Sequence, residues 1–422
     1  MDKLLIKGNS KLSGEVKISG SKNASLPILF ATLLTDEKII LQNIPNLRDI
    51  NTTVQLLEYL GKKVEKIGDE IIITQTNQIK TEAPYELVKQ MRASVLVIGP
   101  VLAKYGKVKV SLPGGCAIGS RPIDIHLCGF QKLCASVDLS NGYVKLKVIG
   151  QKLCGTTIIL DYPSVGATEN LIMAAVLADG ITILENTAKE PEIDDLCNFL
   201  NKIGAKISGI GTSIIKIVGV KVSALHSTTY KIMPDRIEAG TFMIASAVSG
   251  TEILIKNINY FHLDILISKM HLAGSKIEKI DGNNIKVFGN ENIKPVSVET
   301  LPYPGFPTDM QAQWTFFMTQ AKGNSLVTET VFENRFMHIP ELQRMGAKLT
   351  IKGNTVFIEG CSKLTGAQVM ATDLRASAAL VLAGLVTEGE TQISRIYHLD
   401  RGYENIEKKL NNLGANIKRI KE

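Results

Sequence analysis

Ile203-Gly204-Ala205-Lys206-Ile207 is one of six similar stretches that divide the chain into nearly equal parts. In each stretch the third residue after a glycine, or after the residue that replaces it, is aliphatic. The glycine-equivalent positions are 61, 134, 204, 274, 346 and 414, so successive copies lie 68 to 73 residues apart. Such regular spacing indicates an internal structural repeat. The other copies are Leu60-Gly61-Lys62-Lys63-Val64, Leu133-Cys134-Ala135-Ser136-Val137, Ala273-Gly274-Ser275-Lys276-Ile277, Met345-Gly346-Ala347-Lys348-Leu349 and Leu413-Gly414-Ala415-Asn416-Ile417.

Each copy predicts the same small β-α-β-α-β-β unit. A helix that is apolar nearly all round comes first, as in 237–249 and 374–385, and such a helix is expected to be buried. A second, amphipathic helix ends at the repeated glycine, which suits a helix C-cap, and strands follow. We therefore expect an α/β (α+β) fold, an inside-out α/β barrel whose six repeats bury their helices inside sheets.

The six repeats are expected to form two domains of three. The extended stretch 228–234 falls between the third and fourth copies and separates the two groups. Residues 1–20 are expected to form strands that precede the first helix. These strands could pair with either half.

The composition excludes several classes of protein. Hydrophobic residues are 45% and charged residues 21% of the 422 residues, which excludes global disorder. The net charge of +7 is spread along the chain, so it favours anionic partners without requiring nucleic acid. The longest apolar runs, 93–103 and 376–386, reach about half of the roughly 20 residues that a bilayer crossing needs. We therefore expect buried helices and no membrane partner.

Cysteine and histidine usage predicts a cytoplasmic protein without a metal. The six cysteines show no paired spacing, and no signal-peptide core precedes them, so reduced thiols are expected. No His/Cys cluster has zinc spacing. The histidines are interpreted as structural. Five cysteines are expected to be core residues: Cys128, Cys134, Cys154, Cys197 and Cys361.

Arginine is scarce, which makes its positions informative. Only 10 of the 48 basic residues are Arg, and Arg92 and Arg375 begin the same Arg-Ala-Ser triplet at the start of predicted buried helices. Arg236 and Lys22 have comparable positions. Because a helix N-terminus already attracts anions, an added cation there predicts an anion site. The alternative interpretation is that these cations are surface residues with no ligand, which recur only because the sequence repeats.

Two further segments carry candidate catalytic residues. Cys116 lies in a glycine-rich loop five residues before Arg121, where a nearby cation lowers a thiol pKa; alternatively it is a small residue in a turn. Asp309 follows a proline-rich turn and aligns with Asp235 and Asp373 of the neighbouring repeats. The alternative interpretation makes each of these aspartates a helix N-cap.

The motifs together resemble the enolpyruvyl transferase family over almost the whole chain. The resemblance implies one domain at 22–233, carrying a mobile cysteine loop at about 112–121, and another at 1–21 plus 234–422, with the active site in the cleft between them. The matching motifs are Ser21-Lys22-Asn23-Ala24, Met91-Arg92-Ala93-Ser94, 112–124, 306–313, 329–336, Asp373-Leu374-Arg375-Ala376-Ser377 and 397–404.

The resemblance is strongest to the branch that acts on UDP-N-acetylglucosamine, at the first committed step of peptidoglycan synthesis. It implies attack of the sugar 3′-hydroxyl on C2 of phosphoenolpyruvate, a tetrahedral ketal and loss of phosphate, without cofactor or metal. It makes Cys116 the acid toward C3 and the site of a covalent adduct, makes Asp309 the base, and assigns Lys22 and Arg401 catalytic roles. The implied substrate-binding residues are Lys22, Asn23, Arg92, Arg121, Pro122, Ile123, Asp124, Ile125, Ser164, Val165, Asp309, Val331, Asp373, Arg375 and Arg401.

Three alternatives remain open. A shikimate-phosphate enolpyruvyl transferase lacks the Gly-Gly-Cys loop that is present in this chain. A nucleic-acid-binding repeat protein is disfavoured because aromatic residues are 5% of the chain and interleave with no basic stripe. A non-catalytic paralogue could bind the sugar nucleotide and regulate. The expected partners are the two small-molecule substrates, with a monomer favoured.

Overall fold

The computed structural model describes residues 2–112 and 123–421. The described chain divides into two compact units. Unit 1 contains residues 2–19 and 234–421, and unit 2 contains residues 20–112 and 123–233. Each unit has its own hydrophobic core.

Three four-stranded sheets form the shell of unit 2. In spatial order they are β14 (Thr228–Lys231), β3 (Ile39–Gln42), β5 (Glu70–Gln75) and β4 (Lys62–Ile67); β6 (Glu82–Ala83), β7 (Lys107–Ser111), β9 (Tyr143–Val148) and β8 (Ala135–Ser140); and β10 (Thr157–Ile159), β11 (Ile181–Glu185), β13 (Ile214–Val218) and β12 (Lys206–Ser208).

Unit 1 is built in the same way from three further sheets. They are β22 (Gln368–Met370), β23 (Glu390–Ser394), β1 (Lys3–Lys7) and β24 (Asn416–Ile420); β2 (Leu12–Lys17), β15 (Gly250–Lys256), β17 (Asn284–Phe288) and β16 (Ile277–Lys279); and β18 (Val298–Glu299), β19 (Ser325–Thr328), β21 (Thr355–Glu359) and β20 (Lys348–Lys352).

All six described sheets share one topology. The first strand of each is parallel to the second, and the remaining pairs are antiparallel, as in the series β18, β19, β21 and β20. In the sheets of β6, β10 and β18 a helical crossover joins the parallel strands and a hairpin closes the antiparallel pair. The other three sheets take one strand from a distant part of the sequence, namely β14, β2 and β1. This arrangement is the predicted β-α-β-α-β-β unit, so the predicted fold class is confirmed.

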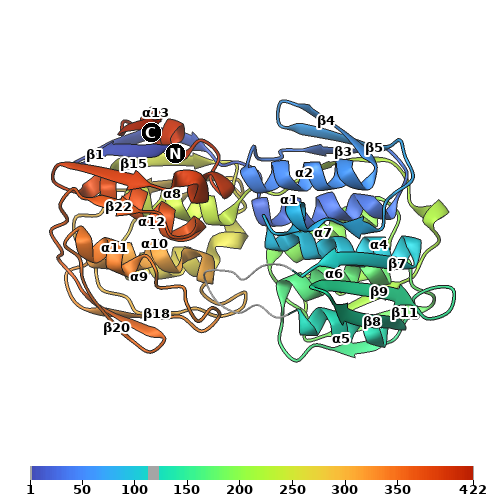
Figure 1. Cartoon of the computed structure of the whole chain (residues 1–422). Helices are drawn as coiled ribbons and strands as arrows, with labels where there is room; N and C mark the ends of the chain where they lie inside the picture. Colours follow the sequence, from blue (N-terminus) through green and yellow to red (C-terminus); the bar gives the residue numbers. More distant parts are fainter. Residues whose placement is uncertain (1, 113–122, 422) are drawn as a thin grey trace. The chain divides into compact units, whose positions relative to one another are not determined.

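The first helix of each repeat lies inside its unit, as predicted. In Figure 1, α8, α10 and α12 lie within the sheets of unit 1. Every residue from Arg375 to Leu385 of α12 is buried. The run 93–103 differs from the expectation, because a 3-10 helix (Arg92–Val97) precedes α4 there. The inner helices are α1 (Lys22–Ala31), α4 (Ile98–Tyr105), α6 (Val165–Ala175), α8 (Arg236–Ser249), α10 (Gln311–Thr319) and α12 (Leu374–Val386).

The repeated glycine ends the second helix of each repeat, as the sequence predicts. Gly204 has a φ of +110°, and a Cβ there would lie 2.3 Å from the Ala224 carbonyl oxygen, so only glycine fits. In the second repeat Cys134 takes this position with a φ of +68°. These outer helices are α2 (Arg48–Leu60), α5 (Asp124–Lys132), α7 (Pro191–Lys202), α9 (Asp264–Leu272), α11 (Ile339–Arg344) and α13 (Ile406–Asn412).

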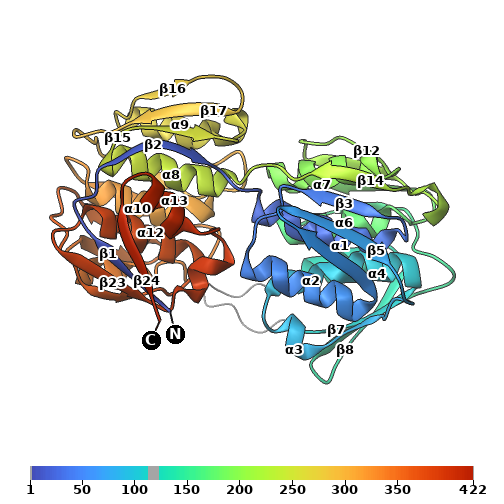
Figure 2. The same cartoon turned by 90° about the horizontal axis from the view of Figure 1, so that it is seen from above.

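The N-terminal strands belong to unit 1, although the helix that follows them, α1, belongs to unit 2. Strand β1 lies between β23 and β24, and β2 pairs in parallel with β15 (Figure 2). The reverse exchange occurs at β14, which pairs with β3 of unit 2 and is followed by α8 of unit 1. Over the described residues the chain therefore passes from one unit to the other twice, and the N-terminal strands, within residues 2–19, belong to unit 1.

The expectation that five cysteines fill the core is wrong for most of them. Cys197 is fully buried in α7, but Cys128, Cys154 and Cys361 are exposed and Cys134 is half-buried. Cys128 has an exposed position on α5, Cys154 forms an isolated β-bridge with Asp179, and Cys361 lies in a bend after β21. The patterning of a segment therefore did not decide the burial of a single position. No helix in the described ranges has the length and apolar character needed to cross a membrane.

One buried amine gives unit 2 a pH-dependent stability. Lys62 donates a hydrogen bond of 2.6 Å to the Thr35 carbonyl oxygen. Burial, reinforced by the nearby charge of Lys104, lowers the pKa of Lys62 to about 7, against the opposing effect of Asp36. The unfolded chain therefore binds one more proton than the native chain between pH 7 and the ordinary lysine pKa. Stability must rise with pH across this interval, by about 1.4 kcal/mol per pH unit at most.

Replacing Lys62 with Met is expected to remove this rise. We expect the unfolding free energy of the native sequence to rise by about 1–2 kcal/mol more than that of Lys62→Met between pH 7 and pH 9. Lys63→Met, which changes an exposed lysine next to it, is the control. Urea titrations at both pH values measure the difference. Parallel curves for all three proteins would contradict the prediction.

Candidate active site

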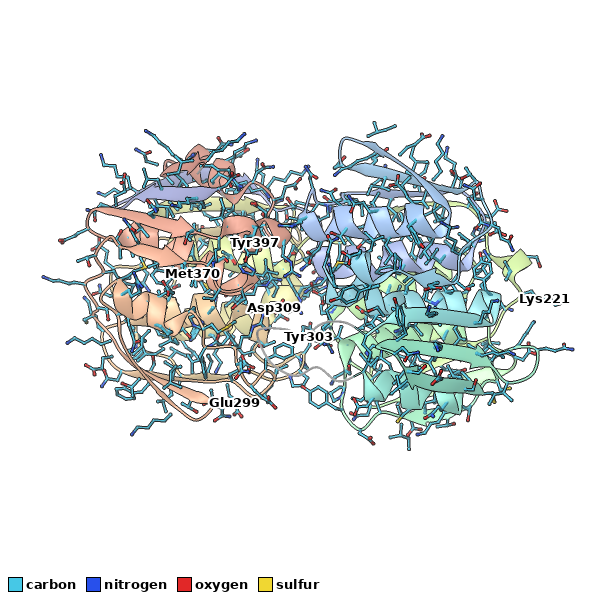
Figure 3. All side chains as sticks on the ribbon, in the orientation of Figure 1. Lys221, Glu299, Tyr303, Asp309, Met370 and Tyr397 are labelled. Carbon is cyan, nitrogen blue, oxygen red and sulfur yellow. The ribbon has the colours of Figure 1, made fainter. Side chains whose placement is uncertain are left out.

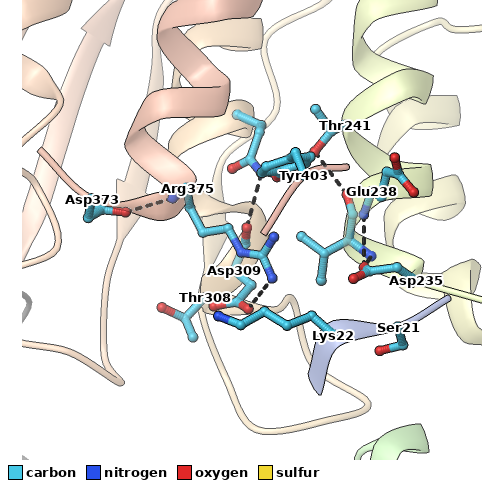
Figure 4. A network of polar contacts seen from close by, with 12 residues as sticks. Ser21, Lys22, Asp235, Glu238, Thr241, Thr308, Asp309, Asp373, Arg375 and Tyr403 are labelled. Carbon is cyan, nitrogen blue, oxygen red and sulfur yellow. Dashed lines mark hydrogen bonds and ion pairs between the residues drawn. The ribbon is translucent and has the colours of Figure 1, made fainter. Parts of the chain in front are cut away.

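Asp309 holds the centre of a charged cluster in unit 1. It lies in a 3-10 helix (Thr308–Met310) directly before α10. Arg335 Nη2 donates to Asp309 Oδ1 at 2.7 Å, and Arg375 Nη2 donates to Oδ2 at 2.9 Å. Figure 4 shows Arg375 reaching Asp309 from the start of α12, and Figure 3 labels Asp309 and Glu299 in the same unit.

The N-cap interpretation is confirmed for two of the three aligned aspartates and wrong for Asp309. Asp235 caps α8 and Asp373 caps α12, each by accepting two backbone N–H groups. The N-cap of α10 is Met310, because the 3-10 turn displaces Asp309 from that position. Its two carboxylate oxygens therefore face arginines instead of the helix backbone.

The two arginines keep Asp309 ionised. Burial alone raises the pKa of the carboxyl, but the charges and hydrogen bonds of Arg375 and Arg335 outweigh it and hold the pKa well below its usual range. Arg375 is itself fully buried; burial lowers its pKa, and the opposing charge of Asp309 raises it above the ordinary arginine value. The pair therefore carries full charges in a poorly solvated place.

Arg375 has unused hydrogen-bonding capacity. Its side chain is 1% exposed, and its Nε and Nη1 atoms have no hydrogen-bond partner among the described residues. A buried guanidinium rarely leaves donors unsatisfied, because each unsatisfied donor costs about 1–3 kcal/mol. The arrangement suits an anion that would accept hydrogen bonds beside Asp309.

A second carboxylate fixes Arg335 and a predicted substrate contact. Arg335 Nη1 donates to Thr308 Oγ1 at 2.8 Å, and Thr308 donates to Glu329 Oε2 at 2.8 Å. The other Glu329 oxygen accepts the Val331 N–H at 2.8 Å and the Phe332 N–H at 3.1 Å. Glu329 thereby links the turn that carries Val331 to the arginine that holds Asp309.

The remaining predicted residues of unit 1 lie at helix ends. Asp373 accepts the N–H groups of Arg375 and Ala376 at 2.7 Å and 3.0 Å. Arg401 is the last residue of a 3-10 helix (Ile396–Arg401) and is half-buried. His338 is fully buried, and burial lowers its pKa to about 4, so this imidazole is neutral, which agrees with a structural role.

In unit 2, Lys22 forms a buried ion pair. It is the first residue of α1, and its Nζ lies 2.8 Å from Asp49 Oδ2 in α2. Ser21 caps α1 by accepting the Ala24 N–H, and Asn23 is the second helical residue. Both members of the pair are buried, which fixes the amine at a helix N-terminus as the sequence predicts.

Several of the predicted substrate-binding residues of unit 2 lie around His126. Arg92 begins the 3-10 helix before α4, and its charge, together with the larger effect of burial, lowers the pKa of His126 to about 4. A Cβ on Gly166 would lie 3.4 Å from the His126 ring, so the start of α6 is next to that of α5. The structure thus brings together Arg92 of that 3-10 helix, Ser164 and Val165 at the start of α6, and Ile123, Asp124 and Ile125 at the start of α5.

Three predicted residues, Cys116, Arg121 and Pro122, lie outside the described residues. Among the residues that are described, no group of three or more His, Cys, Asp or Glu side chains could hold a metal ion.

Sequence reasoning missed the residues that hold Asp309 in place. Arg335, Glu329 and Thr308 act through contacts between segments about 20 to 30 residues apart, which no local pattern encodes. Gln313 and Tyr403 were missed for the same reason. Two signals were available: the scarcity of arginine, which applied to Arg335 as well as to Arg375, and the position of the missed residues within the family motifs 306–313, 329–336 and 397–404.

Comparison with known proteins agrees with this fold and identifies the family. The family model described as EPSP synthase (3-phosphoshikimate 1-carboxyvinyltransferase) matches residues 6–410. The UDP-N-acetylglucosamine 1-carboxyvinyltransferase of Geotalea uraniireducens (strain Rf4) is 55% identical over the whole of both chains. UDP-N-acetylglucosamine 1-carboxyvinyltransferase 2 of Carboxydothermus hydrogenoformans is 53% identical over the same extent.

Solved structures show the same fold. The enolpyruvyl transferase NikO from Streptomyces tendae matches with a TM-score of 0.90 and 23% identity, over 99% of this chain and 98% of that one. An EPSP synthase from Acinetobacter baumannii matches over the whole of both chains with a TM-score of 0.79 and 18% identity. The chain therefore belongs to the enolpyruvyl transferase family and, within it, to the UDP-N-acetylglucosamine 1-carboxyvinyltransferases.

Proposed function

We propose that the chain transfers the enolpyruvyl group of phosphoenolpyruvate to the 3′-hydroxyl of UDP-N-acetylglucosamine and releases phosphate, the first committed step of peptidoglycan synthesis. Full-length identity to relatives of that name supports the proposal. The structural observation that carries it is an ionised Asp309 beside a buried Arg375 whose Nε and Nη1 atoms have no hydrogen-bond partner among the described residues. A base next to an anion site is what a reaction between a hydroxyl and a phosphorylated enol needs.

The proposed chemistry is addition followed by elimination. The hydroxyl oxygen of the sugar bonds to C2, its proton passes to Asp309, and C3 receives a proton from the Cys116 thiol. This gives a tetrahedral ketal that still carries the phosphate. The Cys116 thiolate then takes a proton back from C3 as the C2–O bond to phosphate breaks, and Asp309 returns its proton to the departing phosphate, which leaves the enolpyruvyl ether and inorganic phosphate.

Arg335 and Arg375, together called the arginine clamp, make the basicity of Asp309 depend on bound substrate. While Arg335 and Arg375 both donate hydrogen bonds to Asp309, its pKa is low and the carboxylate does not take a proton readily. A phosphate that accepts hydrogen bonds from Arg375 competes for the same positive charge. The pKa of Asp309 must then rise, so its basicity increases once the anion is bound.

Residues of both units take part in the proposed reaction. Lys22, Arg121 and Arg401 hold phosphate and carboxylate, and Asn23, Val331, Asp373 and Arg375 complete the substrate contacts. The nucleotide is held by Arg92, Arg121, Pro122, Ile123, Asp124, Ile125, Ser164 and Val165. Every proton and the phosphate are accounted for with these groups alone, so the proposal assigns no cofactor. We also propose a cytoplasmic monomer, in line with unpaired thiols.

Phosphate release measured with the purified chain tests the proposal. We expect release from phosphoenolpyruvate to require UDP-N-acetylglucosamine, to fail with shikimate 3-phosphate, and to stop after treatment with the epoxide fosfomycin. Mass spectrometry should then find the added mass on Cys116. Release that resists the epoxide would remove Cys116 from the acid role. Binding of the sugar nucleotide without any release would favour the non-catalytic paralogue and overturn the proposal.

A further inference from the structure

Tyr403 lies directly beneath the Asp309–Arg375 ion pair in unit 1. Its side chain is 2% exposed, and its ring centroid lies 5.4 Å from the Arg375 guanidinium carbon. Its hydroxyl lies 3.0 Å from Gln313 Nε2 and 3.0 Å from Thr241 Oγ1. Figure 4 shows Tyr403 between Arg375 and Thr241. Tyr403 thus contacts Arg375 with its ring, and Gln313 and Thr241 with its hydroxyl.

The direction of these hydrogen bonds follows from counting donors. Thr241 has one hydroxyl proton and donates it to the Ile237 carbonyl oxygen at 2.9 Å. Tyr403 must therefore donate to Thr241 Oγ1. The phenol oxygen is then free to accept from Gln313 Nε2, so a directed chain runs from Gln313 through Tyr403 to Thr241 and the backbone of α8.

Gln313 connects this chain to Asp309. Its Nε2 donates to the Asp309 carbonyl oxygen at 3.1 Å as well as to Tyr403, while Thr241 Oγ1 lies farther away at 3.2 Å. The Gln313 side-chain atom that faces the Asp309 carbonyl oxygen must be the amide nitrogen, because that carbonyl oxygen can only accept a hydrogen bond. The phenol hydroxyl therefore fixes the amide that holds the backbone of the proposed base, and the phenol ring supports Arg375.

We propose that Tyr403 is a positioning residue that sets the geometry of Asp309 against Arg375 without touching substrate. The inference rests on the proposed function, because it concerns the base of that reaction. Within unit 1 the charged groups facing Asp309 are Arg335 and Arg375, and Asp235 acts on both Arg375 and Tyr403 from the start of α8. Displacing Arg375 weakens the clamp, so Asp309 becomes easier to protonate.

Two variants separate the hydroxyl from the ring. Tyr403→Phe keeps the ring under Arg375 and removes the hydroxyl with its contacts to Gln313, Thr241 and Arg375, and Tyr403→Leu removes both ring and hydroxyl. We expect kcat to fall about 10-fold in the first and about 100-fold in the second, with the KM values within about 2-fold of the native ones. The acid limb of the kcat profile should move upward by about one pH unit in Tyr403→Leu and less in Tyr403→Phe.

The matched control is Tyr230→Phe in unit 2. Tyr230 also donates a phenol hydrogen bond, to Asp195 Oδ1 at 2.7 Å, so the variant loses a comparable bond far in sequence from Asp309. It is expected to melt at a lower temperature and to keep its kcat and acid limb. Gln313→Met, alone and combined with Tyr403→Phe, tests the series of hydrogen bonds from Gln313 through Tyr403 to Thr241. Residues linked in one network give losses of activity that do not add.

Each outcome decides between the inference and its alternatives. A Tyr403→Phe protein with native kcat and native acid limb overturns the inference, and so does one that loses melting temperature and kcat with an unmoved acid limb. Additive losses in the double variant overturn the link through Gln313. A native protein that releases no phosphate refutes the proposed function instead, and that arm is run first.

Discussion

Asp309→Asn is expected to reduce phosphate release by about 10³-fold, the largest effect of any single change to the cluster. Asparagine keeps the shape of the side chain but cannot accept the hydroxyl proton. It also removes the negative charge that lies between Arg335 and Arg375, which are 6% and 1% exposed. Two buried guanidinium groups would then repel each other, so we also expect a loss of about 3 kcal/mol in unfolding free energy.

Steady-state kinetics and urea denaturation of the same preparation separate the two effects. Asp264→Asn, at the exposed start of α9, is the matched control and should keep both activity and stability. Added inorganic phosphate should raise the melting temperature of Asp309→Asn more than that of the native protein, since the arginines lack their carboxylate. A variant with more than a tenth of native kcat would exclude Asp309 as the base.

Lys22→Met is expected to lose both activity and stability, for two separable reasons. The change leaves Asp49 buried without its cation, and breaking a buried pair from one side costs about 3–5 kcal/mol. It also removes a cation that the proposed reaction uses to hold an anion. We expect phosphate release to fall by at least about 100-fold.

A second substitution distinguishes these causes. In Lys22→Met combined with Asp49→Asn, the uncompensated charge is gone, so most of the unfolding free energy should return while phosphate release stays low. Melting curves and initial rates of the single and double variants form the test. Recovery of the rate together with stability would mean that Lys22 acts by holding α1 against α2, and would remove it from the anion site.

Much of the architecture could be predicted because it is repetitive. The regular spacing of Gly61, Gly204, Gly274, Gly346 and Gly414 reflects one backbone requirement, a left-handed residue at the end of an outer helix. Cys134 meets the same requirement at a steric cost, which is why the second repeat still follows the pattern. Local chemistry of this kind is visible in a sequence.

The active-site geometry could be predicted only in part, for a physical reason. The position of Arg375 at the start of a buried helix follows from the repeat, but its contact with Asp309 depends on how α12 packs beside the turn before α10. Repeat logic also favoured an N-cap role for Asp309, and the 3-10 turn broke that equivalence. The prediction that the cysteines are buried failed for a similar reason. The exposure of one residue depends on which side of a helix it occupies or on its place in a connecting segment.

The position of β1 imposes an order on synthesis. Strand β1 leaves the ribosome roughly 400 residues before β24, one of its two neighbours in the sheet. At about 5–20 residues per second, β1 waits roughly 20–80 seconds for that neighbour. Unit 2 can complete its own chain during this interval, whereas unit 1 cannot close until β24 has been made. A message cut short before β24 would yield a protein with an open strand edge, a species prone to aggregation and easily recognised by chaperones and proteases.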